Sequence, residues 1–158
     1  MSAVRRILVP TDFSEGSTSA LAFARELADA TGASLCVVHA VEPCPVNQYN
    51  EGCYLPANYL EQVESSARRD LESVLNAEEK RRYDARLVLL NGSAPQVILS
   101  YLRAHGDIDL VVMATHGRGG VSRFMMGSVA DKIVRTAPCP VLTIRVLDAA
   151  ESKADRAA

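Results

Sequence analysis

The chain has 158 residues, 48% of them hydrophobic, and a chain of this length is typical of one domain with one core. It contains no apolar run of the roughly 18 residues that span a membrane, and Met1–Arg6 lacks the features of a signal peptide, so we expect a soluble cytoplasmic protein without membrane contact. The formal net charge is −2 and the basic residues are scattered among acidic ones, which excludes the strong positive field that holds nucleic acid.

Five apolar runs of strand length follow one another along the chain, and segments of helical period lie between them. The runs are Ile7–Val9, Leu35–Val41, Leu87–Leu90, Leu110–Ala114 and Val141–Val146. They lack polar alternation, so we expect every strand to be buried on both faces. Strands that alternate with helices are typical of a parallel sheet with helices on both faces, and the sequence therefore predicts an α/β fold.

Four helices have start or stop signals in the sequence. Ser14 is the expected N-cap of the first, which ends at Thr31–Gly32. Capping-box pairs begin the other three, and Gly106 is the expected stop of the third; the pairs are Asn58 with Glu61, Ser93 with Gln96, and Ser128 with Asp131. The second helix carries an apolar stripe of Leu60, Val63, Ala67, Leu71 and Val74.

Two segments fall outside the alternation of strands and helices. The segment 42–57 is a long loop after the second strand, and either a lid that stacks Tyr49 or Tyr54 on a ligand or a disordered surface excursion accounts for it. We assign residues 1–147 to the domain and expect the tail 148–158, mostly Ala and charged residues, to be mobile. The cysteines have no metal-site spacing, so we interpret them as ordinary thiols: Cys36, Cys44, Cys53 and Cys139.

The carboxyl ends of the strands are where an open parallel sheet binds ligands. The fourth strand runs into Thr115–Gly120, whose three glycines allow the backbone to approach a ligand and whose successive amides form an anion cradle. A tight corner is the alternative interpretation of such glycines. Gly127 and Ser128, at the start of the fourth helix, add further amides and the helix dipole. The pattern therefore predicts a polyphosphate ligand.

Four segments, in this order, resemble the universal stress protein family. They are Ile7–Ser14, Thr115–Gly120, Gly127–Ala130 and Ala137–Leu142. The resemblance extends from Ile7 to about Val146. It implies a single doubly wound parallel sheet of five strands in the order 3-2-1-4-5, of the adenine nucleotide alpha hydrolase-like kind.

The nucleotide-binding branch of that family has the glycine pattern G-x2-G-x9-G-[S/T], and this chain is similar to it with one departure. Here the pattern reads Ala114-x2-Gly117-x9-Gly127-Ser128, so Ala114 replaces the first glycine. Alanine fits if the backbone there has β dihedrals, whereas a positive φ would strain it.

The resemblance also implies the residues that bind an adenine nucleotide. An adenosine pocket is implied at Pro10, Thr11, Asp12 and Ala40. The phosphates are expected along Gly117, Arg118, Gly119 and Gly120 and against Gly127, Ser128 and Val129, and the implied nucleotide-binding residues also include Ala114, Thr115 and His116. The expected ligand is ATP, ADP or AMP, and a Mg²⁺ ion would come with the phosphates. Asp12 either contacts the ribose or adenine or forms an Asx-turn, and one side chain can do both.

A homodimer joined through the last strand, Val141–Val146, is implied as well, and the apolar makeup of this strand agrees with edge pairing. Three functions stay open. The first is a stress-response dimer regulated by an adenine nucleotide, and the second is a nucleotide-free interaction module. The third is a slow ATP hydrolase, although His116 has no nucleophile or paired carboxylate beside it in the sequence and is interpreted as a loop donor.

Overall fold

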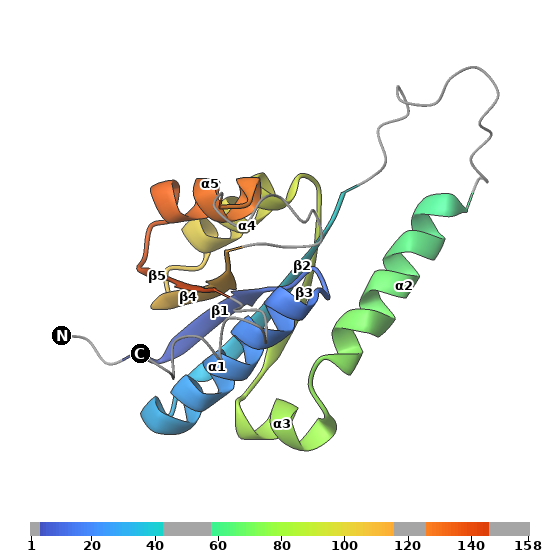
Figure 1. The fold of residues 1–158 in the computed structure, drawn as a ribbon. Coiled ribbons are helices and arrows are strands. Elements are labelled where there is room, and N and C mark those ends of the chain that lie inside the picture. The colour runs from blue at the N-terminus through green and yellow to red at the C-terminus, as the bar shows by residue number, and fades with distance from the viewer. Residues whose placement is uncertain (1–3, 43–57, 116–125, 146–158) are drawn as a thin grey trace, which may run out of the picture.

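The computed structural model describes residues 4–42, 58–115 and 126–145. Their elements are, in chain order, β1 (Arg6–Pro10), α1 (Glu15–Thr31), β2 (Ser34–Val41), α2 (Tyr59–Ser73), α3 (Ala77–Arg82), β3 (Arg86–Asn91), α4 (Ala94–Ala104), β4 (Leu110–Ala114), α5 (Ser128–Thr136) and β5 (Val141–Ile144) (Figure 1). Within the described ranges, no helix has the length and apolar content to cross a membrane.

The strands form one parallel sheet in the order β3-β2-β1-β4-β5, which confirms the α/β class and the implied strand order. The central strand is β1, in which Ile7 pairs with Leu35 of β2 on one side and with Leu110 of β4 on the other. The strand order therefore reverses between β1 and β4. In an open sheet the ligand crevice lies at this reversal, outside the carboxyl ends of the strands.

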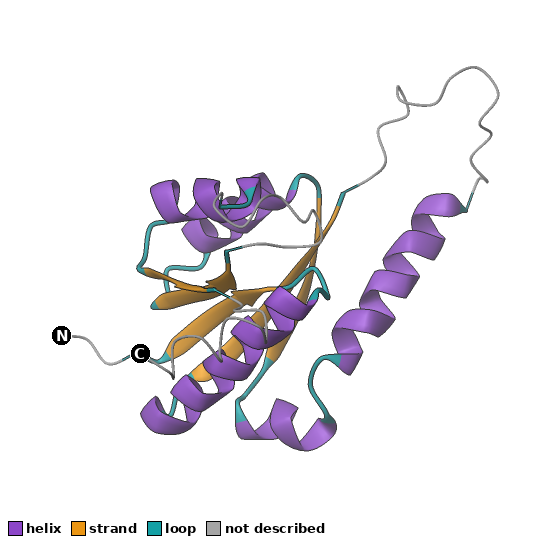
Figure 2. Ribbon diagram, in the orientation of Figure 1, coloured by secondary structure: helices purple, strands orange, loops and turns teal. Residues whose placement is uncertain are grey.

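Helices cover both faces of the sheet, with α1 and α2 on one side and α4 and α5 on the other (Figure 2). Alternate side chains of β1 enter the two layers, as the strand pleat requires. Ile7 and Val9 join the layer of α1 and α2, whereas Leu8 joins the layer of α4 and α5. All three side chains are 0% exposed. The central strand thus contributes buried side chains to the core layers on both faces of the sheet.

The edge strands correct the expectation that every strand is buried on both faces. No described residue of β3 or β5 is fully buried, and the ends of β3, Arg86 and Asn91, are exposed. An edge strand has a neighbour on one side only, so its apolar composition does not suffice for complete burial. Similarly, the stripe on α2 contacts the core through Ala67 and Leu71, while Leu60 is 56% exposed.

The helix signals are confirmed for α1 and need correction elsewhere. Ser14 is the N-cap of α1, and its Oγ accepts a hydrogen bond from Ser17 N at 3.3 Å. Gly32 ends this helix with a φ of 74°. Asn58 and Ser93 stand at the N-cap positions of α2 and α4, but neither side chain makes the capping hydrogen bond.

Two helix ends lie one residue before the predicted position. The N-cap of α5 is Gly127 rather than Ser128, and the C-cap of α4 is His105 rather than Gly106. The short helix α3 was not predicted, because too few residues lie in it to show a helical period. Its signal was nevertheless present in the sequence, since Asn76 and Glu79 form a complete capping box.

Gly92 in the turn between β3 and α4 generates a stability prediction. Its φ is 131°, and a Cβ atom there would lie 2.8 Å from Cγ1 of Val97. Gly92→Ala should lower the free energy of unfolding by about 2 kcal/mol, through both backbone strain and overlap. Gly106→Ala is the matched control, because nothing lies within 4 Å of its added Cβ. Urea denaturation that gives the same loss for both variants would contradict this account.

Candidate functional site

The sequence-predicted site residues that the structure describes meet at the carboxyl edge of the sheet. Pro10 ends β1 and continues into Thr11 and Asp12, Ala40 lies near the end of β2, and Ala114 ends β4 and continues into Thr115. Gly127, Ser128 and Val129 form the start of α5. The remaining predicted residues lie outside the described ranges: His116, Gly117, Arg118, Gly119 and Gly120.

Thr11 anchors the turn that joins β1 to α1. Its backbone N–H extends the sheet by donating to the Val38 carbonyl at 2.9 Å. Its hydroxyl accepts from Phe13 N at 3.1 Å and donates to Ser17 Oγ at 3.1 Å. Thr11 and Ser17 are the two buried polar residues in the described part of the chain, with 8% and 5% exposure. Their mutual hydrogen bond satisfies both hydroxyls, as burial of polar groups requires.

Asp12 makes the Asx-turn that the sequence allowed. Its Oδ1 accepts from Ser14 N at 3.1 Å and from Ser14 Oγ at 2.5 Å. The carboxylate therefore lies at the N-terminus of α1, where the helix dipole stabilises negative charge. Because Ser14 Oγ also accepts from Ser17 N, the turn and the first turn of α1 share one hydrogen-bond network.

Phe13 takes a left-handed conformation within this turn, with a φ of 63°. For a bulky residue this conformation costs about 1–2 kcal/mol. Each hydrogen bond of the turn contributes about 1 kcal/mol, so the bonds of Thr11 and Asp12 together exceed that cost. The Phe13 ring adds a contact with the imidazole of His39 in β2, at 4.3 Å between ring centroids.

His39 itself belongs to the site although the site prediction omitted it. Its Nδ1 lies 2.8 Å from the carbonyl oxygen of Thr11, so β2 contacts the β1–α1 turn through a side chain. The sequence held one signal, since His39 is the single ionisable residue of β2 apart from the Cys36 thiol. A polar ring near the end of a buried strand indicates a specific partner, but the sequence does not say which.

Ala114 fits its position without strain. It is the last residue of β4, pairs with Ile144 of β5, and is not among the described residues of positive φ. The missing glycine of the pattern therefore does not distort the strand. Beyond it, Thr115 O accepts a hydrogen bond from Gly127 N at 2.8 Å. Thr115 and Gly127 thus lie together at the carboxyl end of β4.

The N-terminus of α5 is suited to an anion. Its N-cap, Gly127, has extended dihedrals (φ −60°, ψ 150°) and carries no capping side chain. The acidic residue of the first turn, Asp131, forms an ion pair with Arg135 at 2.8 Å. The first amides of α5 therefore have no side-chain acceptor among the described residues, and unpaired amides with the helix dipole bind phosphate.

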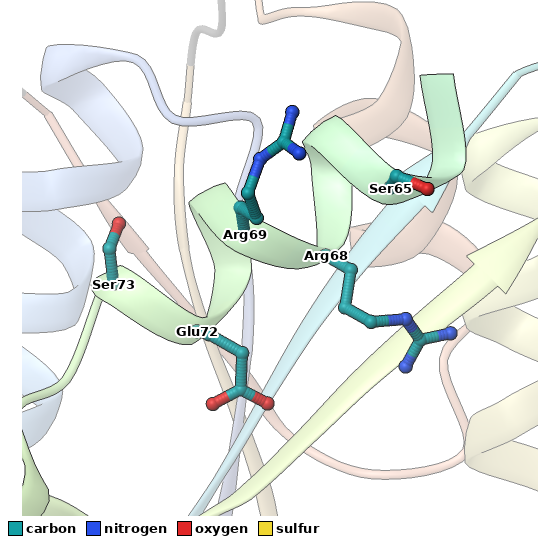
Figure 3. A pocket seen from close by; sticks show the side chains of 5 residues that line it. All are labelled: Ser65, Arg68, Arg69, Glu72 and Ser73. Carbon is teal, nitrogen blue, oxygen red and sulfur yellow. The ribbon is translucent and has the colours of Figure 1, made fainter. Parts of the chain in front are cut away.

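A shallow hollow of about 570 Å³ lies elsewhere, on the exposed face of α2 (Figure 3). It is lined by Ser65, Arg68, Arg69, Glu72 and Ser73. These residues are spaced along one face of α2. Figure 3 shows that the side chains of Arg68 and Arg69 extend from this face in different directions. Their donors do not converge on a common point, and none of the predicted site residues is among them.

The two described cysteines have the properties of ordinary thiols. Both are free, and burial raises the pKa of Cys36 and of Cys139. Cys36 Sγ lies 3.5 Å from the hydroxyl of Tyr101, whose pKa rises to about 12, chiefly through burial. Protonated thiols are poor nucleophiles. Cys44, Cys53, Tyr49 and Tyr54, all in the segment for which a lid and a surface excursion were alternatives, lie outside the described residues, as does the tail.

Comparison with known proteins gives one consistent result. The model of the Universal stress protein family matches residues 3–145. The universal stress protein in QAH/OAS sulfhydrylase 3'region of Thermus aquaticus is 36% identical over 151 residues, covering 89% of this chain and 98% of that protein.

Solved structures agree with this result. A universal stress protein family member from Burkholderia pseudomallei is 26% identical with a TM-score of 0.66, and the likeness covers 91% of this chain and 98% of that one. A universal stress protein in complex with cAMP is 23% identical with a TM-score of 0.62, over 91% and 98% of the two chains. The second likeness shows a common fold.

The network around Ser14 generates a prediction on α1. Ser14→Ala should lower the free energy of unfolding by about 1 kcal/mol, because it removes the acceptor of Ser17 N. Ser93→Ala is the matched control, since Ser93 is also an N-cap but makes no capping bond with its side chain. Thermal and urea denaturation of both variants measure the difference. Equal losses would mean that the Ser14 hydroxyl contributes nothing specific.

Proposed function

This chain belongs to the universal stress protein family, and from that premise we propose that it binds ATP or another adenine nucleotide at the carboxyl edge of its sheet. It acts in the cytoplasm as a dimer whose surface or partners change with nucleotide occupancy during stress. The observation that carries the proposal is the hydrogen bond from Gly127 N to Thr115 O. It holds the start of α5 at the end of β4, the strand beside β1 and its Thr11–Asp12 turn.

The phosphates have a physical reason to lie at α5. The first amides of the helix, which have no side-chain acceptor among the described residues, and the positive end of the helix dipole favour an anion there. Ser128 is exposed in the first turn, so its hydroxyl is available to donate to a phosphate oxygen. With Ala114 as its last residue, β4 keeps a regular strand conformation up to the proposed phosphate site. These features support the phosphate half of the site that the glycine pattern implies.

The adenosine half is supported by the β1–α1 turn and the end of β2. Asp12 and Thr11 follow β1 directly, and Ala40 lies near the end of the neighbouring strand. A relative with the same fold has been solved in complex with cAMP, which is also an adenine nucleotide. The common fold and the resemblance of the Ile7–Ser14 segment together favour adenosine over other nucleosides at this edge.

A Mg²⁺ ion would reach this site with the phosphates. Among the described residues, no group of three His, Cys, Asp or Glu side chains is close enough to hold a metal. The donors at the site are amides and hydroxyls, which suit phosphate oxygens better than a bare cation. When bound, a Mg²⁺ ion would neutralise part of the negative charge of the phosphates. The residues of the chain would bind and orient the nucleotide.

Two other functions stay as alternatives to this proposal. A nucleotide-free interaction module would use the same fold and dimer, and Ala114 in place of the first glycine is the feature that favours it. A slow ATP hydrolase would need a positioned water and a group that stabilises the transition state. Asp12 accepts hydrogen bonds from Ser14, and His116 has no nucleophile or paired carboxylate beside it in the sequence. Regulated binding is therefore preferred to turnover.

Nucleotide binding is tested by denaturing the purified protein, chromatographing the released small molecules, and titrating the stripped protein. Calorimetry with ATP, AMP and cAMP, with and without Mg²⁺, should detect binding of at least one of them. Gly127→Val should weaken it by about 100-fold, roughly 2.7 kcal/mol, because a branched side chain then occupies the phosphate approach. The dihedrals of Gly127 are ones that valine adopts, so the fold should persist.

Gly106→Val is the control for this substitution, because Gly106 lies beyond the end of α4 with nothing within 4 Å of an added Cβ. It should bind as the wild type does. No released nucleotide and no heat at millimolar ligand would favour the nucleotide-free module. Rapid turnover that depends on Asp12 would favour the hydrolase.

The proposed dimer uses the side of β5 that faces no other strand of the described sheet. Val111 N donates to Pro140 O and Thr115 N donates to Ile144 O, both at 3.0 Å. Backbone groups alternate in direction along a strand, so the N–H and C=O of Val141 and Thr143 point away from β4. An isologous pair of β5 strands would satisfy these groups, because an unpaired edge is a template for another strand.

A proline at that edge tests the dimer. Thr143→Pro removes the outward N–H and keeps the bonds to β4, so it should weaken dimerisation at least about tenfold without unfolding the chain. Thr143→Val keeps the amide and should leave the dimer unchanged. Light scattering at micromolar concentration gives the mass of each variant. A monomeric wild type would remove the dimer from the proposal.

A further inference from the structure

We infer that His39 is a positioning residue for the proposed nucleotide site, holding the β1–α1 turn in one conformation and thereby aiming the Asp12 amide at the crevice between β1 and β4. The role toward a ligand rests on the proposed function. The contact of His39 with the β1–α1 turn does not depend on that function. Three observations lead to this inference, and all concern residues of β1, β2 and the turn.

The first observation is the hydrogen bond between the imidazole and the turn. His39 Nδ1 lies 2.8 Å from Thr11 O. A carbonyl oxygen only accepts, so Nδ1 must carry the proton. Both the neutral Nδ1–H tautomer and the charged imidazolium satisfy this contact, whereas the neutral Nε2–H tautomer does not. The contact thus requires a proton on Nδ1 of His39 and excludes the neutral Nε2–H tautomer.

The second observation is the direction of the peptide that joins Thr11 to Asp12. Thr11 N donates to Val38 O, and Thr11 O accepts from His39, so both groups face β2. In a planar trans peptide the C=O and the next N–H point in opposite directions. The Asp12 N–H therefore points away from β2, toward the side on which β4 pairs with β1. This is the side of the strand-order reversal, where the ligand is expected.

The third observation is the left-handed Phe13. Its φ of 63° is unfavourable for an aromatic residue, and such outliers persist only where their surroundings hold them. The imidazole of His39 packs on the Phe13 ring at a centroid distance of 4.3 Å and an interplanar angle of 36°. One side chain of β2 therefore holds the turn at two points, by a hydrogen bond to Thr11 and by ring contact with Phe13.

Three substitutions separate the hydrogen bond from the ring contact. In His39→Phe the ring stays and the donor is lost. In His39→Asn the amide Nδ2 takes the place of Nδ1 relative to Cβ, so the donor is kept. In His39→Gln the same amide group lies one bond further out and no longer matches Nδ1. Circular dichroism and thermal unfolding establish that each variant is folded, and the Asn and Gln variants suffice if the Phe variant is not.

The free protein gives the first measurement. Nitrogen-15 NMR of the imidazole should show the proton of His39 on Nδ1. Amide hydrogen exchange should be about tenfold faster at Phe13 and Ser14 in the Phe and Gln variants, whose turns are released, and near wild type in the Asn variant. A neutral Nε2–H tautomer, or equal exchange in all variants, would overturn the inference.

Titration with ATP, AMP and cAMP gives the second measurement. The Phe and Gln variants should bind about tenfold more weakly than the wild type, and the Asn variant within about threefold of it. His105→Gln is the control, because His105 lies at the end of α4 and bonds to Tyr101 O. It should bind as the wild type does.

The two measurements distinguish the inference from the function on which it rests. If the wild type binds and the Phe and Gln variants bind equally well, the inference is wrong and the proposed function stands. If the wild type binds none of the three nucleotides, the proposed function is wrong. Amide exchange then still decides whether His39 holds the turn, since that measurement needs no ligand.

Discussion

The pairing of β1 with a parallel strand on each side is the constraint on which the rest of this structure depends. Because β2 and β4 flank β1, their carboxyl ends and the turn after β1 come together at one edge. The same pairing places Ile7 and Leu8 in opposite core layers, both 0% exposed, so a shift of register would expose both layers at once. Stability of the core and position of the site thus have a common origin.

Two sets of hydrogen bonds hold the chain in place at this edge. On one side, Gly127 N bonds to Thr115 O and returns the chain to the end of β4. On the other, the Thr11 and Asp12 side chains bond back to Phe13, Ser14 and Ser17 and join the turn to α1. The first set joins Thr115 to Gly127 across the residues between them, whereas the second set is local to the β1–α1 turn. For the proposed nucleotide, an edge that is organised in advance would reduce the entropy cost of binding.

Much of the fold could be predicted from the sequence because its signals are local. The strand β4, Leu110–Ala114, has the bounds that its apolar run predicts, and Ser14 and Gly32 delimit α1 as expected. Other local signals gave the wrong residue, such as Ser128 for the cap of α5, since two neighbouring residues were chemically acceptable caps. The short helix α3 was missed because six residues carry little periodicity. The strand order came from family resemblance.

For the site, the sequence by itself determined the family, the glycine pattern and the segments that reach the carboxyl edge. Residue order and residue type are enough for these, because parallel strands bring their ends to a common edge. Only the tertiary structure decided that Ala114 lies in regular strand, that Asp12 bonds to Ser14, and that His39 contacts Thr11. The last contact joins residues 28 positions apart in the chain, in neighbouring strands. Such a contact depends on strand register and side-chain direction, which are properties of the packed sheet rather than of any local segment.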